Sequence, residues 1–79
     1  MKIKIHLFGV LGIKIPELNS PEGVDIEVPD GATVRDVLNQ LRIPDNWGVT
    51  AAMDSRLLKY EDPVRDGAEI RLLQTVHGG

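Results

Sequence analysis

Apolar and polar residues alternate in two segments of the first third of the chain. Within residues 2–10, aliphatic residues occupy alternate positions on one side of the segment: Ile3, Ile5 and Leu7. The opposite side is polar with one exception, the aromatic Phe8. Because successive side chains of a strand point to opposite faces, this period of two predicts a strand with one buried face. Residues 24–28 alternate in the same way and predict a second strand.

A single amphipathic helix is predicted after the turn at residues 29–31. Thr33 is the expected N-cap, and Asp36 completes a capping-box-like pair with Asp in place of the usual Glu or Gln. The helical stripe at i, i+3, i+4 and i+7 consists of Val34, Val37, Leu38 and Leu41. Pro44 cannot continue the hydrogen-bond ladder, so we expect it to end the helix.

The second half of the chain predicts three more strands, at residues 49–53, 57–59 and 68–75. One helix cannot cover both faces of a sheet, so the second face is expected to meet solvent. The predicted fold is α+β of the ubiquitin-like β-grasp type, a mixed sheet of four to five strands with one main helix on one face. We expect residues 1–79 to form a single domain with a flexible C-terminal tail at about 76–79.

Composition excludes several classes of function. With no cysteine, the chain has no disulfide, thiolate metal site or cysteine nucleophile. A net charge of −3 and three aromatic residues argue against nucleic-acid binding, which needs clustered cations and stacking surfaces. The start of the chain lacks the apolar core of a signal peptide, and no apolar run approaches a membrane span. We therefore expect a cytoplasmic protein that binds neither nucleic acid nor membrane.

Residues suited to catalysis are few. The two histidines, His6 and His77, lack further expected ligands, so no metal site is predicted. The sequence contains no phosphate-binding loop and no complete dinucleotide fingerprint, so we expect no cofactor bound by this chain. Its carboxylates fall in turns and on solvent-facing strand positions, where they are poor general acids. We therefore expect a carrier or non-catalytic subunit rather than an enzyme.

The open sheet face is the first candidate site. By alternation, Phe8 and Leu73 both point away from the helix-packed core, and Leu57 on the short strand widens the apolar area. An apolar cluster of this kind is typical of a docking patch for another protein. Three cations, Lys2, Lys4 and Arg71, are expected to surround it.

The second candidate site is the pair Gly78-Gly79 at the end of the sequence. Neither residue has a Cβ, so such a tail fits a channel too narrow for side chains and presents an unhindered carboxylate. Chemistry at this carboxylate has to be performed by another protein.

The chain resembles the MoaD/ThiS sulfur-carrier family, which includes the molybdopterin synthase small subunit and the thiamine-pathway sulfur carrier. The resemblance covers nearly the whole sequence. It rests on segments at residues 7–9, 31–38, 52–54, 63–70 and 78–79.

The resemblance implies that an activating enzyme uses ATP and Mg²⁺ to adenylate the carboxylate of Gly79. A sulfur donor then displaces AMP, and the resulting thiocarboxylate gives its sulfur to a second enzyme, of the molybdopterin synthase large subunit or thiazole synthase type. The resemblance also places Phe8, Leu57 and Leu73 at the family's apolar docking positions. Residues 76–79 look more like the thiamine branch, and residues 7–9 and 12–23 more like the molybdopterin branch, so the pathway stays open.

Two other functions remain open. A ubiquitin-like modifier uses the same adenylated glycine to acylate a lysine of another protein. A plain β-grasp binding module has the same fold, and its glycine tail is incidental.

Overall fold

The computed structural model describes residues 1–74, so the predicted tail at 76–79 lies outside the described residues. In chain order the elements are β1 (Lys2–Gly9), α1 (Leu11–Lys14), η1 (Pro16–Leu18), β2 (Val24–Glu27), α2 (Val34–Gln40), η2 (Asp45–Trp47), β3 (Thr50–Met53), β4 (Arg56–Leu58) and β5 (Glu69–Gln74). The two η elements are short 3₁₀ helices.

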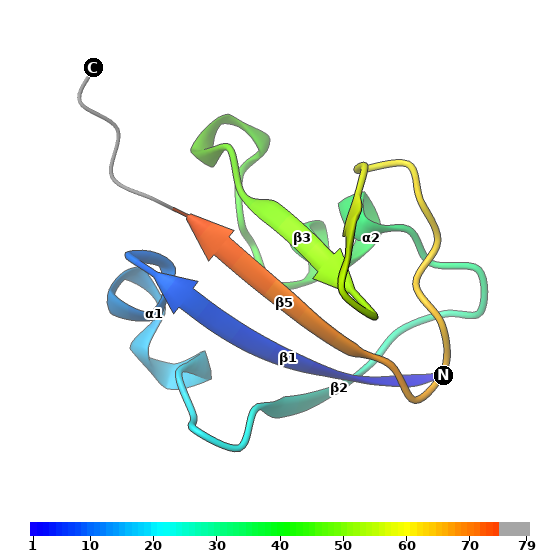
Figure 1. Cartoon of the computed structure of the whole chain (residues 1–79), viewed down its shortest axis with the longest axis horizontal. Helices are drawn as coiled ribbons and strands as arrows, with labels where there is room; N and C mark the ends of the chain where they lie inside the picture. The colour runs from blue at the N-terminus through cyan, green and yellow to red at the C-terminus, as the bar shows by residue number, and fades with distance from the viewer. Residues whose placement is uncertain (75–79) are drawn as a thin grey trace.

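The strands form one five-stranded sheet in the order β2-β1-β5-β3-β4. The central pair β1 and β5 is parallel, whereas β1–β2, β3–β4 and β3–β5 are antiparallel. This arrangement confirms the mixed sheet and the ubiquitin-like fold that the alternating segments predict. Because β1 and β5 run in the same direction, their C-terminal ends lie side by side, next to α1 (Figure 1).

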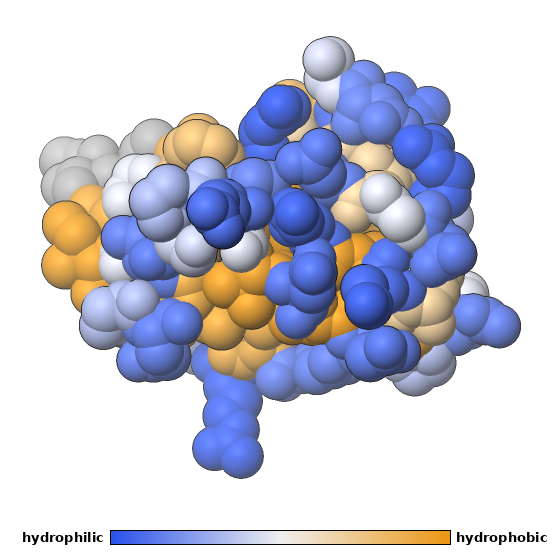
Figure 2. Space-filling view, turned by 90° about the horizontal axis from the view of Figure 1, so that it is seen from below, coloured by the Kyte–Doolittle hydropathy of each residue, from blue (hydrophilic) through white to orange (hydrophobic). Residues whose placement is uncertain are grey.

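The core lies between the sheet and α2. Val34, Val37 and Leu38 of α2 are buried together with alternate residues of the central strands, among them Ile3, Ile5, Ile70 and Leu72. The helix therefore covers one face of the sheet, as expected. At the β2 edge, seen from below in Figure 2, apolar surface remains visible between hydrophilic residues.

The start of α2 is as the sequence predicts, but its end is not. Thr33 Oγ1 accepts from the Asp36 backbone N–H at 3.3 Å, and Asp36 Oδ2 accepts from the Thr33 N–H at 3.0 Å. The helix ends at Gln40, before the predicted stop at Pro44. Arg42 adopts φ 61°, which allows the Ile43 N–H to donate to Leu38 O at 2.9 Å. This left-handed cap terminates the helix independently of the proline.

The sequence patterns missed the short helices. Residues 11–14 form one helical turn, α1, in which only Leu11 and Gly12 are buried. One turn is too short to show a helical period, so the apolar pattern gave no signal there.

Candidate docking surface and the end of strand β5

The open face of the sheet has an ordered cross-strand arrangement. Phe8 on β1 lies opposite Leu73 on β5, and Leu73 lies opposite Thr50 on β3. The next row, further from the C-terminal ends of β1 and β5, contains His6 on β1, Arg71 on β5, Ala52 on β3 and Leu57 on β4. The predicted docking residues therefore occupy two adjacent rows at the end of the sheet where β5 finishes.

These residues surround a shallow apolar hollow, called the docking hollow below. Phe8 is 45% exposed, Leu57 73% and Leu73 38%, so all three sites present apolar surface to solvent. The hollow has a volume of about 430 Å³ and is lined by Phe8, Thr50, Ala52, Leu57, Arg71 and Leu73. The structure thus brings together the three apolar residues that the sequence analysis selected.

The predicted cationic rim is only partly correct. Arg71 lines the docking hollow, but Lys2 and Lys4 do not. The parallel register sets Lys4 opposite Glu69, two rows away from the Phe8–Leu73 row, and Asp25 flanks Lys4 on β2. Lys2 and Lys4 instead line a separate depression together with acidic residues of neighbouring segments.

His6 lies on the open face, as expected, and its Nε2 is 2.8 Å from Glu69 Oε1. Within residues 1–74, no three His, Cys, Asp or Glu side chains are grouped so that they could hold a metal ion. His77 lies outside the described residues. Among the described residues, His6 thus makes a polar contact with Glu69 on the open face of the sheet.

The end of β5 is fixed by Gln74, whose side chain is buried on the core side of the sheet. Its Nε2 donates to the backbone oxygen of Trp47 at 2.6 Å, and its own backbone oxygen accepts from the Val10 N–H at 3.0 Å. Its Oε1 is also buried and has no hydrogen-bond partner among the described residues. The strand end is thereby held to η2 on one side and to β1 on the other.

Gly9 allows the close approach of β1 to this strand end. Its φ is +66°, and a Cβ built there would lie 2.3 Å from the backbone oxygen of Gln74. That distance is far inside van der Waals contact, so only glycine fits without moving the backbone. The last two residues of the sequence, Gly78 and Gly79, lie outside the described residues and follow this fixed point.

Comparison with known protein families identifies the family to which this chain belongs. The family model described as ThiS family matches residues 13–79, most of the chain. The chain belongs to the ThiS family. The match includes β5 and the terminal glycine pair. No curated protein matches the sequence significantly.

Three solved structures have the same fold as this ThiS-family chain. Molybdopterin converting factor subunit 1 from Pyrococcus furiosus has a TM-score of 0.70 at 20% identity, covering 96% of this chain and 99% of that one. SAMP1 from Haloferax volcanii has a TM-score of 0.70 at 18% identity with full coverage of both chains. A chain in the complex of molybdopterin-converting factor subunits 1 and 2 from Helicobacter pylori has a TM-score of 0.60 at 20% identity, again covering both chains fully.

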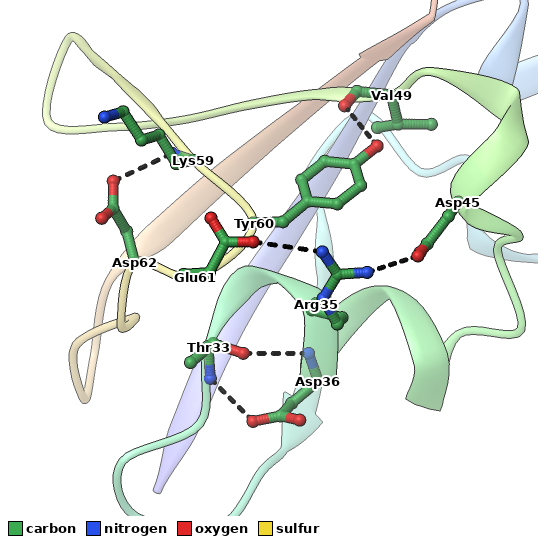
Figure 3. A network of polar contacts seen from close by, with 9 residues as sticks. All are labelled: Thr33, Arg35, Asp36, Asp45, Val49, Lys59, Tyr60, Glu61 and Asp62. Atoms are coloured by element: carbon green, nitrogen blue, oxygen red, sulfur yellow. Dashed lines mark hydrogen bonds and ion pairs between the residues drawn. The ribbon is translucent and has the colours of Figure 1, made fainter.

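A polar network on the other side of the ThiS-family domain braces its loops (Figure 3). The Arg35 guanidinium contacts Asp45 Oδ2 and donates to Glu61 Oε2 at 3.1 Å, and it lies 5.3 Å from the Tyr60 ring. Tyr60 Oη in turn donates to the Val49 backbone oxygen at 3.0 Å. The hydrogen bond to Glu61 and the charge of Asp45 raise the pKa of Arg35 above its ordinary value. The network joins α2 to the loops on either side of β3 and β4.

Sequence reasoning missed two features of the site, the burial of Gln74 and the separation of Arg71 from the two lysines. The burial of Gln74 had a signal in the sequence, because Gln74 continues the alternation of Ile70 and Leu72 on the core face.

No helix within residues 1–74 has the length and apolar character needed to cross a membrane.

Proposed function

We propose that the chain is a sulfur carrier that works through its last residue, Gly79. The observation that carries the proposal is the ThiS-family match over residues 13–79, which includes the terminal glycine pair. The docking hollow lies directly beside the strand that leads to these residues. A partner seated on Phe8 and Leu73 would therefore be close to the end of β5, after which the remaining residues of the chain follow.

The proposed chemistry is supplied by partner enzymes. An activating enzyme, using ATP and Mg²⁺, joins the Gly79 carboxylate to AMP and releases pyrophosphate. Hydrosulfide from the sulfur donor then attacks the acyl carbon, the bond to AMP breaks, a proton is released to solvent, and a thiocarboxylate remains. This chain contributes the carboxylate, two residues without side chains that fit a narrow channel, and a rigid domain that partners can hold. It needs no catalytic group of its own.

We propose that a sulfur-accepting synthase is the second partner. The Helicobacter pylori structure contains molybdopterin-converting factor subunits 1 and 2 in one complex, and its fold matches this chain over its full length. The ThiS-family model and the molybdopterin converting factors suggest different acceptor pathways, of thiamine or molybdopterin type. We expect the carrier to act in the cytoplasm.

The second candidate function is protein modification. SAMP1 from Haloferax volcanii, a small archaeal modifier protein, has the same fold with a TM-score of 0.70. In this alternative the adenylated Gly79 acylates a lysine of another protein, and no sulfur is carried away. Both functions require the same first step, adenylation of the terminal carboxylate.

Intact-protein mass spectrometry of the chain purified from its native host tests the proposal. A fraction in which sulfur replaces one oxygen at Gly79 is expected, and it should disappear when Gly79 is deleted. If the cognate activating enzyme, ATP and a sulfur source never produce this species, the carrier function is wrong. Recovery of Gly79–lysine isopeptides without any thiocarboxylate would instead support the modifier.

Deletion of Gly79 separates both functions from a plain binding module. A binding module would keep its activity without this residue, whereas a carrier or modifier would lose it completely. A variant with one extra alanine after Gly79 is a useful control, because it keeps the fold and both glycines but moves the carboxylate.

A further inference from the structure

Arg71 is a cation in the middle of an otherwise apolar hollow. It lies between His6 and Ala52 in the cross-strand row, and Leu57 follows on β4. The Phe8–Leu73 row borders it on the side of the strand ends. Its side chain is exposed, and within residues 1–74 it pairs with no carboxylate. The guanidinium is thus available to whatever covers this face.

Two of the other four arginines are paired among the described residues. Arg35 contacts Asp45 and Glu61, and Arg65 Nη2 lies 2.7 Å from Asp54 Oδ2. The one acidic residue of β5 is Glu69, whose Oε1 lies 2.8 Å from His6 Nε2. Arg42, Arg56 and Arg71 have no ion pair among the described residues, and Arg71 is the one of these three that lines the docking hollow.

Covering the hollow would change the energetics of Arg71. Removing water from the apolar lining is favourable. Removing water from a guanidinium without supplying a hydrogen-bond acceptor costs much free energy. A partner that buries Phe8 and Leu73 must therefore supply an acceptor to Arg71. The planar guanidinium matches a carboxylate through two parallel hydrogen bonds, and Ala52 is small enough to leave room beside it.

We propose that the activating enzyme covers the docking hollow with an apolar surface that carries one Asp or Glu side chain against Arg71. The inference rests on the proposed function and adds the chemistry by which the partner is recognised. We assign this contact to the activating enzyme because adenylation is the first step for both the carrier and the modifier. A basic or purely apolar surface at the same place is rejected, so Arg71 selects among possible partners.

The test is ATP–pyrophosphate exchange by the adenylating enzyme of the same organism, with this chain as substrate. Arg71→Gln should raise the KM by about thirtyfold or more, the lower end of the range for removing one member of a buried charge pair. The kcat should change little, because Arg71 belongs to the proposed docking contact and lies eight residues before Gly79 in the sequence. Arg71→Lys should lose less than Arg71→Gln, and Arg71→Glu more. Raising the salt concentration should increase the KM of the wild type more steeply than that of Arg71→Gln.

Arg42→Gln is the matched control, because it removes the same charge from an exposed arginine outside the hollow. Its KM should equal that of the wild type. Thermal unfolding of Arg71→Gln should also match the wild type, which separates recognition from folding. Either of two results would overturn the inference: a KM for Arg71→Gln within about twofold of the wild-type value, or a rise in KM that does not depend on the salt concentration. Exchange with the wild-type chain as substrate would in that case still support the proposed function. If the wild-type chain supports no exchange, the proposed function fails and this inference falls with it.

Discussion

Phe8 and Leu73 lie directly opposite each other on the parallel strands β1 and β5 and project together onto the open face of the sheet. The two residues are far apart in the sequence. Their contact depends on the parallel register, which also aligns Gly9 with Gln74 at the end of the same strands. A single pairing therefore sets both the apolar docking hollow and the point from which the last residues of the chain begin.

Phe8→Ala should weaken binding of the activating enzyme by about 1–3 kcal/mol, as expected for an aromatic anchor in an interface. The domain should remain folded, because Phe8 is 45% exposed and contributes less to the core than a buried aromatic residue. Isothermal titration calorimetry and urea unfolding measure the two effects separately.

Ile13→Ala is the control for the Phe8 variant. Ile13 is 78% exposed and does not line the docking hollow, so its truncation should leave the affinity unchanged. Unchanged affinity for Phe8→Ala together with a collapse of stability would mean that Phe8 belongs to the core.

Gly9→Ala should destabilise the domain more than Gly48→Ala. Both glycines have positive φ, +66° and +64°, but only a Cβ at Gly9 meets another atom, the Gln74 backbone oxygen at 2.3 Å. The two variants share the conformational cost of a left-handed residue, so their difference isolates the steric overlap, about 1–3 kcal/mol for overpacking. Urea unfolding measures this difference. Equal losses of stability in the two variants would mean that β5 can move away from β1 without a cost in free energy.

The alternation of apolar and polar residues along single strands predicted much of this site. Period two along residues 2–10 and 68–75 sets Phe8 and Leu73 on the face opposite Ile5 and Leu72, and the structure confirms it. The same rule would have placed Gln74 in the core, but its polar side chain obscured the pattern. Its burial is tolerated because Trp47, distant in sequence, supplies an acceptor.

Alternation could not predict how the strands align with one another. It sets Lys2, Lys4 and Arg71 on one face but gives no information about the rows to which they belong. The register between β1 and β5 places Lys4 beside Glu69 and His6 beside Arg71, so only the arginine reaches the hollow. The left-handed end of α2 at Arg42 was equally hidden, because arginine carries no local signal for positive φ.

Ser55→Gly should stabilise the domain by up to about 1 kcal/mol. Asp54 and Ser55 form the two-residue turn between β3 and β4, with φ values of 53° and 64°. A non-glycine residue costs about 1–2 kcal/mol in this region, and the greater freedom of unfolded glycine cancels part of the gain. Thermal unfolding measures the shift. Ser55→Ala keeps the Cβ and should give no gain, and an equal gain from alanine would contradict the backbone explanation.

Arg35→Gln should lower stability, and the loss should shrink as salt is added. The guanidinium pairs with Asp45 and Glu61 on an exposed surface, where ion pairs are screened at high ionic strength. Because the pKa of Arg35 is raised above its ordinary value, its contribution is fully present below that value and is lost only as the pH rises through the raised one. The titration of Arg35 itself should therefore add no pH dependence between about pH 5 and 9.

Urea unfolding of the wild type and Arg35→Gln, at low and at molar salt, measures this effect. Arg42→Gln is the control, since Arg42 makes no ion pair with the described residues and its variant should show no salt-dependent difference from the wild type. A loss in Arg35→Gln that persists unchanged at high salt would show that Arg35 acts through its packing over the Tyr60 ring. In that case Tyr60→Leu should cancel most of the effect of removing Arg35, because the two residues are joined by the same contact.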